Sequence, residues 1–300
     1  MFEGFTSETA DVGDTTIFLR RKGNGTPLLL LHGFPQTHVM WHATAPALSD
    51  AFTVICADLR GYGLSGKPAS SPGHEPYSKR VMAADMVRMM HHLGYPRFAV
   101  AGHDRGGRVA YRMAFDHPDS VMALAVLDIV PTSEVFDRAD ARLAMTFWPW
   151  SLLAQPAPLP ERLILAAPDA VIDDALSGWG SDASAFPTQV RTAYLEALSD
   201  PAAVHAICEE YRAAASIDTT LDRIDRENGK MIGCPTLVLW SQGSGVETWY
   251  ESDGGPLAIW RRWARTVSGG PIAGGHFFPE ERPIETTGHL LDFFGATPSS

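Results

Sequence analysis

The chain has 300 residues, of which 45% are hydrophobic and 20% are charged, a balance that is ordinary for a globular protein and leaves room for one α/β domain with an insertion. Its net charge of −11 argues against a nucleic-acid-binding protein, which usually carries a basic surface. The 3 cysteines lack motif spacing, and the sequence has neither a signal-peptide pattern nor an apolar run of membrane-spanning length, so a cytoplasmic protein without membrane contact is expected.

The first part of the chain predicts the beginning of a buried sheet. Residues 15–20 alternate weakly in polarity and predict an edge strand. Residues 27–31 read Pro-Leu-Leu-Leu-Leu, which is typical of a strand buried on both faces. This strand ends in a tight turn, His-Gly-Phe-Pro at 32–35, whose backbone can face a reaction centre. We assign the backbone N–H of Phe34 to one half of an oxyanion hole, and His32 to a structural hydrogen bond.

The next segments predict a second buried strand and a helix. The strand is expected at 52–57, and Asp58 in the glycine-punctuated loop after it is expected to form a turn or a salt bridge with Arg60. Ser78 suits the N-cap of a helix that Gly94 terminates. Methionines recur in this helix at helical spacing, which indicates core packing rather than a metal site: Met82, Met86, Met89 and Met90.

Residues 102–108 read Gly-His-Asp-Arg-Gly-Gly-Arg and lie between an apolar run at 97–101 and a helix-like run at 109–114. Strand, Gly-x-nucleophile-x-Gly and helix is the layout of a nucleophile elbow, in which glycine permits a tight turn. The projecting residue is Asp104, where most such elbows carry serine. A carboxylate is already ionised at neutral pH, and it favours attack on carbon–halogen or epoxide substrates over ordinary esters. The backbone N–H of Arg105 is assigned to the second half of the oxyanion hole.

Such an elbow requires an acid and a histidine later in the chain. The apolar strand at 123–126 leads to Asp128, at the end of a strand where ligands bind in doubly wound sheets. The strand expected at 235–240 has acids only further on, so we assign Asp128 to orient the catalytic histidine rather than to cap a helix. His276 lies in a glycine-flanked loop after the last strand and completes the order nucleophile, acid, histidine.

Alternating buried strands and helices predict an α/β fold with a mostly parallel, doubly wound sheet. From residue 131 the pattern changes to helical segments without a buried strand. We therefore expect a core domain at 1–130 and 223–300 and an inserted helical cap at 131–222, which would shape the pocket and exclude water. The other predicted segments are helices at 169–179, 188–198, 256–265 and 284–294 and a chain end at 297–300.

Five motifs, taken together, resemble the fluoroacetate dehalogenases of the α/β-hydrolase superfamily, and the resemblance covers nearly the whole chain, cap included. The motifs are Gly-His-Asp-Arg-Gly at 102–106 with Arg108, Val-Leu-Asp-Ile at 126–129, Leu-Ala-Gln-Pro-Ala-Pro-Leu-Pro-Glu at 153–161, Cys-Glu-Glu-Tyr-Arg-Ala at 208–213 and Gly-His-Phe at 275–277. Epoxide hydrolases share the elbow, but they usually carry tryptophan after the aspartate.

The resemblance implies an α/β-hydrolase fold and a haloacetate dehalogenase, which converts fluoro-, chloro- or bromoacetate to glycolate and halide through a covalent aspartyl ester. It implies that Asp104 attacks the carbon bearing the halogen, and that His276, oriented by Asp128, activates water. It implies that Arg105 and Arg108 clamp the substrate carboxylate, since paired guanidinium groups suit a planar carboxylate. It implies a small anionic haloacid as the ligand, no cofactor or metal, and a homodimer.

The family's halide pocket consists of a histidine, an adjacent tryptophan and a tyrosine. Trp150 and Tyr211 match this pattern, but Pro149 stands where the family has the histidine. Proline has no side-chain donor and no N–H. Since fluoride is small and strongly hydrated, a pocket with one donor fewer predicts easier release of chloride or bromide than of fluoride.

Two alternative functions remain open from the sequence. An epoxide hydrolase would use the same aspartate with phenol donors, for which Tyr194 and Tyr211 are candidates, but neutral epoxides do not need an arginine pair. A non-enzymatic ligand receptor on the same fold would tolerate loss of a triad member, and none is missing here.

Overall fold

The computed structural model describes residues 1–296, so the expected chain end at 297–300 lies outside the described residues. Within this range the strands form an 8-stranded sheet in the order β1-β2-β4-β3-β5-β6-β7-β8. The strands are β1 Thr6–Asp11, β2 Thr16–Lys22, β3 Thr26–Leu31, β4 Phe52–Ala57, β5 Phe98–His103, β6 Val121–Leu127, β7 Thr236–Ser241 and β8 Val267–Ile272. β2 is antiparallel to β1 and β4, whereas the pairs from β4 to β8 are parallel. The predicted doubly wound α/β architecture is therefore confirmed.

The structure differs from the sequence predictions at two points in the N-terminal part. β2 lies between β1 and β4, so the predicted edge strand is an interior one; β1 takes the edge, and its mostly polar, exposed sequence gave no apolar signal. Of the two roles expected for Asp58, the salt bridge with Arg60 is not formed, whereas the turn role is: its carboxylate accepts hydrogen bonds from the backbone N–H groups of Leu64, in the glycine-punctuated loop, and of His38. Arg60 instead pairs with carboxylates of other segments, Asp14 and Asp85.

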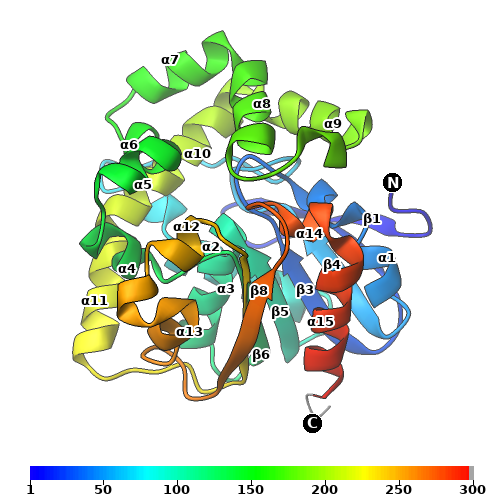
Figure 1. Cartoon of the computed structure of the whole chain (residues 1–300). Coiled ribbons are helices and arrows are strands. Elements are labelled where there is room, and N and C mark those ends of the chain that lie inside the picture. Colours follow the sequence, from blue (N-terminus) through cyan, green and yellow to red (C-terminus); the bar gives the residue numbers. More distant parts are fainter. Residues whose placement is uncertain (297–300) are drawn as a thin grey trace.

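Helices cover both faces of the sheet, with α15 in front and α2 and α3 behind in the view of Figure 1. Ser78 caps α2 by accepting from the N–H of Val81, and Gly94 follows the helix with φ +86°, as expected. The helices outside the β6–β7 connection are α1 Ala45–Leu48, α2 Lys79–His92, α3 Asp104–Asp116, α12 Gly245–Thr248, α13 Gly255–Trp260, α14 Phe278–Glu281 and α15 Pro283–Gly295.

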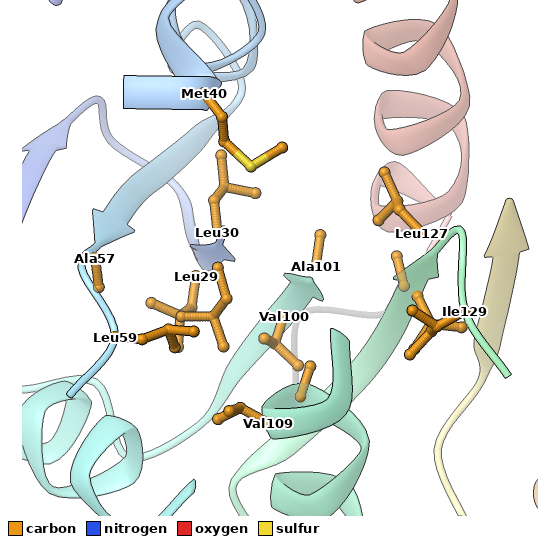
Figure 2. Packing of buried hydrophobic residues seen from close by; sticks show 14 of the residues in the cluster. Leu29, Leu30, Met40, Ala57, Leu59, Val100, Ala101, Val109, Leu127 and Ile129 are labelled. Atoms are coloured by element: carbon orange, nitrogen blue, oxygen red, sulfur yellow. The ribbon is translucent and has the colours of Figure 1, made fainter. Parts of the chain in front are cut away.

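The core lies around the central strands, where apolar side chains from both sheet faces are removed from water. Leu29 and Leu30 of β3 and Val100 and Ala101 of β5 are fully buried, and Figure 2 shows Leu29 and Val100 on the sheet face covered by Val109 of α3, with Leu30 and Ala101 on the opposite face. The unbroken apolar runs of β3 and β5 reflect burial on both faces. This packing fixes the ends of β3 and β5, from which the candidate site is built.

The chain between β6 and β7 contains helices and no sheet strand within the described residues, and Figure 1 shows α7, α8 and α9 standing over one end of the sheet. These helices are α4 Thr132–Asp137, α5 Ala141–Thr146, α6 Pro149–Leu152, α7 Leu159–Ala166, α8 Pro168–Gly178, α9 Thr188–Leu198, α10 Pro201–Ala213 and α11 Thr219–Glu227. Within residues 1–296, no helix combines the length and apolar character needed to cross a bilayer.

Candidate active site

The turn between β5 and α3 projects Asp104 from the carboxyl end of a central strand. Asp104 has φ +43°, a left-handed conformation that a non-glycine residue rarely adopts and that marks a strained turn. The neighbouring backbone is tightly packed: a Cβ added at Gly106 would lie 2.4 Å from the carbonyl oxygen of His32. Glycine at this position therefore lets the elbow sit against the end of β3.

The end of β3 supplies a backbone donor to this carboxylate. The N–H of Phe34 donates to Oδ2 of Asp104 at 3.1 Å. Gly33 makes this approach possible, because a Cβ there would lie 2.6 Å from the Cβ of Asp104. His32 is buried and forms structural hydrogen bonds, its Nε2 accepting from the N–H of Leu59, as the sequence predicted. The Phe34 N–H thus lies where charge would develop on an oxygen of an Asp104 ester.

Asp128 and His276 meet at the same edge of the sheet. Asp128 follows β6 with φ +55°, and its Oδ2 lies 2.6 Å from Nδ1 of His276. Its Oδ1 accepts from the N–H of Ser241 at 2.9 Å, which fixes the carboxylate. Asp128 therefore orients the imidazole so that Nε2 is the nitrogen left for a proton transfer.

The loop that carries His276 is hydrogen-bonded to the inserted helical segment. The N–H of His276 donates to the carbonyl oxygen of Trp179 at 3.0 Å, and the N–H of Phe277 donates to Oγ of Ser181 at 3.3 Å. The fit needs glycine, since a Cβ at Gly275 would lie 2.3 Å from the backbone of Gly180. The segment between α8 and α9 thus helps to hold the histidine in place.

The electrostatics of the site keep the Asp104 carboxylate ionised and make the His276 ring a better base. Burial acts to raise the pKa of Asp104, but the positive charges of His276 and of the nearby arginines outweigh it and lower that pKa. Burial acts to lower the pKa of His276, but the hydrogen bond and charge of Asp128 outweigh it and raise that pKa. The pair is suited to a nucleophile and a general base.

Asp104 and His276 line a small cavity of about 30 Å³. Arg108 is the arginine among its lining residues. The rest of the lining is mainly apolar and aromatic, and includes Val135, Leu143, Phe147, Trp150, Val246, Trp249 and Tyr250. A cavity of this size and composition fits a ligand of a few heavy atoms with one anionic group.

The two arginines expected to act as a pair have different surroundings. Arg108 donates through Nη1 to the carbonyl oxygen of Val130 at 3.0 Å and stacks on Trp150, with Cζ 4.4 Å from the ring centroid. Arg105 lies outside the cavity lining, and Glu210 binds its Nε at 2.8 Å and its Nη2 at 2.5 Å. Among the described residues, Nε of Arg108 and Nη1 of Arg105 are buried without a hydrogen-bond partner. Each guanidinium therefore retains at least one unused N–H donor.

The expected halide-binding residues lie next to the arginines. The Trp150 ring lines the cavity, whereas Tyr211 lies outside the lining, with ring centroids 6.2 Å apart. The Tyr211 ring faces the Arg105 guanidinium at 3.9 Å. Pro149 is the first residue of α6 and is buried. The structure thus places Trp150 in the cavity wall, and Tyr211 lies behind Trp150, outside that wall.

A family model described as alpha/beta hydrolase fold matches residues 26–254, which is more than half of the chain. The chain belongs to the α/β-hydrolase family. This confirms the family resemblance and the fold class expected from the sequence.

Two characterised relatives of this hydrolase span most of its length. The fluoroacetate dehalogenase of Burkholderia sp is 44% identical over 98% of this chain and 95% of that protein. The soluble epoxide hydrolase of Corynebacterium sp. (strain C12) is 30% identical over 91% of both chains. Among solved structures, a chain from Nostoc sp PCC 7120 described as an alpha/beta hydrolase superposes with a TM-score of 0.94 at 47% identity, over 99% of this chain and 100% of that one.

Sequence reasoning missed several residues that shape the site of this hydrolase. Glu210 binds Arg105 and contacts Lys79, although its motif Cys-Glu-Glu-Tyr-Arg-Ala had been singled out only for Tyr211. Trp249 and Tyr250 line the cavity from the segment after β7, in which the sequence analysis considers only acidic residues. Glu210 could have been found from the sequence, because it stands next to Tyr211 in that motif. Nothing in the sequence marks the aromatic residues as part of the cavity wall.

Proposed function

We propose that this hydrolase is a dehalogenase of short haloacids such as chloroacetate, bromoacetate and fluoroacetate. The observation that carries the proposal is Asp104, held in a strained elbow turn and sharing a small cavity with the Arg108 guanidinium. A carboxylate nucleophile suits displacement at saturated carbon, and a guanidinium suits a substrate that carries a carboxylate. The similarity to a protein named fluoroacetate dehalogenase supports the same reaction class.

In the first step, an oxygen of Asp104 forms a bond to the substrate carbon while the carbon–halogen bond breaks, and the halogen leaves with the bonding electrons as halide. The free Nε–H of Arg108, and the Nη1–H of Arg105 if its side chain moves, would bind the substrate carboxylate. This contact offsets the repulsion between two anions and aligns the carbon with the nucleophile. Trp150 in the cavity wall would donate its indole N–H toward the leaving halide.

In the second step, His276 takes a proton from water, and the hydroxide formed attacks the carbonyl carbon of the Asp104 ester. The Phe34 N–H, which donates to Asp104 at 3.1 Å, would hold the oxyanion together with the N–H of Arg105. When the tetrahedral intermediate collapses, the bond between the carbonyl carbon and the substrate oxygen breaks, and that oxygen takes the proton held by His276 and leaves as the hydroxy acid. The Asp104 carboxyl group loses its proton to solvent and is again a carboxylate. Asp128 keeps the His276 ring oriented through both proton transfers.

We also propose that the inserted helices serve as the cap of this site. Leu143 and Trp150 of α5 and α6 line the cavity, and Trp179 holds the N–H of His276. Closing the cavity from this side would exclude bulk water while the halide leaves.

Halide selectivity tests the proposal directly. We expect faster chloride release from chloroacetate than fluoride release from fluoroacetate, because Pro149 removes one donor that the leaving fluoride needs. Loss of one donor to a developing anion commonly costs about 3 kcal/mol, or roughly a hundredfold in rate. Initial rates measured side by side with halide electrodes decide the question. Equal rates, or faster fluoride release, contradict the donor count, and release of neither halide contradicts the dehalogenase proposal.

The proposed carboxylate contact predicts a selective effect of Arg108→Gln. Charge-assisted hydrogen bonds contribute about 1.5–3 kcal/mol, so KM for chloroacetate is expected to rise roughly 10- to 100-fold. Chloroacetamide is the matched control, since it keeps the carbon–chlorine bond but lacks the carboxylate. A similar loss with both substrates would mean that Arg108 supports the fold of the site rather than the substrate charge.

Epoxide hydrolysis is the second candidate, favoured by the Corynebacterium relative and by Tyr250, a phenol in the cavity wall. Tyr194, one of the two phenols considered from the sequence, is bound to Glu280 at 2.9 Å and lies outside the cavity lining. A buried guanidinium in the cavity has no counterpart in a neutral epoxide. Diol formation from a small epoxide in the absence of halide release would favour this alternative.

A further inference from the structure

A chain of buried polar side chains runs behind the catalytic loop and ends on His276. Oη of Tyr194 lies 2.9 Å from Oε1 of Glu280, and Oε2 of Glu280 lies 2.5 Å from the Gln36 side-chain amide. The other end of that amide lies 3.0 Å from Nδ1 of His103, whose Nε2 lies 2.8 Å from the carbonyl oxygen of His276. Gln36, His103 and Tyr194 are fully buried, and Glu280 is 5% exposed.

The hydrogens in this series of bonds can be assigned by starting from the carbonyl oxygen of His276. A carbonyl oxygen only accepts, so Nε2 of His103 carries the hydrogen that binds His276. Burial lowers the pKa of His103 to about 3, so this ring is neutral and its Nδ1 accepts. In the structure Nε2 of Gln36 faces Glu280 and Oε1 faces His103. That orientation sets Oε1 against the lone pair of Nδ1, two acceptors, so we turn the amide over, with its NH₂ toward His103 and its oxygen toward Glu280.

An amide oxygen facing Glu280 needs a hydrogen from it, so the carboxyl group must be protonated. The hydroxyl of Glu280 would donate to Gln36, while its carbonyl oxygen accepts from Tyr194. Every buried polar side chain in this hydrogen-bonded series then has a partner, and none of its members carries a charge.

Among the described residues, no arginine or lysine forms an ion pair with Glu280. His42 is the basic side chain within 4.0 Å of its carboxylate, and burial lowers the pKa of His42, which keeps that ring neutral. The adjacent Glu281 carries a like charge and accepts from the N–H of Gly275. Burial raises the pKa of Glu280 to about 8, against the opposing effect of the hydrogen bond from Tyr194.

We propose that Glu280 is a neutral carboxylic acid that positions His276, acting through Gln36 and His103 on the backbone carbonyl of the catalytic loop. The assignment of His276 as the base rests on the proposed function. Because Tyr194 belongs to α9 of the inserted helices, the same chain ties those helices to the catalytic loop. Glu280 is a positioning residue, since it reaches the reacting atoms only through other groups.

Two substitutions of Glu280 distinguish a positioning role through hydrogen bonds from an effect of side-chain size or charge. Glu280→Gln keeps one donor toward Gln36 and one acceptor for Tyr194, so turnover of chloroacetate at pH 7 is expected to stay within about threefold of the wild type. Glu280→Leu removes both bonds, and a catalytic group displaced by about 1 Å loses roughly a hundredfold in rate. Glu285→Gln, an exposed change on α15, controls for the loss of one negative charge. Loss of activity in Glu280→Gln equal to that in Glu280→Leu would overturn the proposal.

The pH dependence of unfolding tests the protonation state without using activity. Folding raises the pKa of Glu280 from 4.5 to about 8. Between these pH values the unfolded protein has lost the Glu280 proton while the folded protein still holds it, so the free energy of unfolding of the wild type falls as pH rises. Glu280→Gln lacks this loss. Its unfolding midpoint, relative to that of the wild type, should therefore increase between pH 5 and 8 and stay constant above. A difference that is flat or falls over this interval would mean that Glu280 is ionised and would overturn the proposal.

The alkaline limb of activity gives a further check. Above pH 8 an ionised Glu280 can no longer donate to Gln36, so wild-type kcat should decline there while Glu280→Gln keeps its rate. Identical alkaline limbs count against the proposal. A wild-type protein that releases no halide would remove the proposed function, but the unfolding series would still decide whether Glu280 is neutral.

Discussion

Asp104→Asn is expected to release halide at less than about one ten-thousandth of the wild-type rate, in line with the loss seen when a catalytic nucleophile is removed. An amide is a poor nucleophile toward saturated carbon, yet its oxygen can still accept from the Phe34 N–H that bonds Asp104 at 3.1 Å. The turn should therefore keep its shape while its chemistry is lost. Halide release by freshly purified protein, beside a thermal unfolding curve, measures both properties.

The wild-type protein provides the matched control for this substitution. During turnover in ¹⁸O-labelled water, attack on the ester carbonyl should place the label in the Asp104 carboxylate, which peptide mass spectrometry detects. Label found only in the product would mean that water attacks the substrate directly. Stable, near-wild-type activity of the Asn variant would contradict the nucleophile assignment, whereas slow recovery on standing would indicate deamidation to aspartate.

His276→Asn is expected to stop the reaction after the first step. Asp104 can still be alkylated, but no base remains to activate water, so the ester accumulates. Incubation with chloroacetate should release about one halide per active site, and the peptide containing Asp104 should gain the mass of one carboxymethyl group. Steady-state turnover should fall by roughly 10⁴-fold or more, comparable with removal of a triad histidine.

The Asp128→Asn variant is a useful companion, because it keeps the imidazole but removes the charge 2.6 Å from its Nδ1. It should accumulate the same ester and hydrolyse it slowly. Normal turnover by the His276 variant without any adduct would contradict the two-step scheme and would require another base in the cavity.

Much of the site was predictable because its residues are marked by their immediate sequence neighbours. Asp104 stands between glycines after a buried strand, Phe34 follows the glycine of a tight turn, and His276 lies in a glycine-flanked loop. These turn signals fixed which side chains project from strand ends. Asp128 needed one further argument, the chain order of the elbow family, and the structure places it against His276.

The surroundings of the two arginines were not predictable in this way. Arg105 looked equivalent to Arg108, three residues later on the same helix, and both were expected to clamp a carboxylate. The structure places Glu210 against Arg105, a partner 105 residues away in the chain, whereas Arg108 lines the cavity. Which guanidinium is neutralised depends on how α10 packs over α3, and no local pattern reports that packing.

The sequence by itself determined the alternation of buried strands and helices, the glycine-flanked turn that projects Asp104, and the candidate set of Asp104, Asp128 and His276 in that chain order. These features depend on hydrophobic periodicity and turn chemistry within about a dozen residues. Only the tertiary structure decided that β2 is an interior strand, that Glu210 holds Arg105, and that Glu280 reaches His276 through Gln36, 244 residues away in the chain. The physical reason is that a buried polar group must find a partner wherever the fold brings one within about 3 Å, and that partner can lie anywhere along the chain.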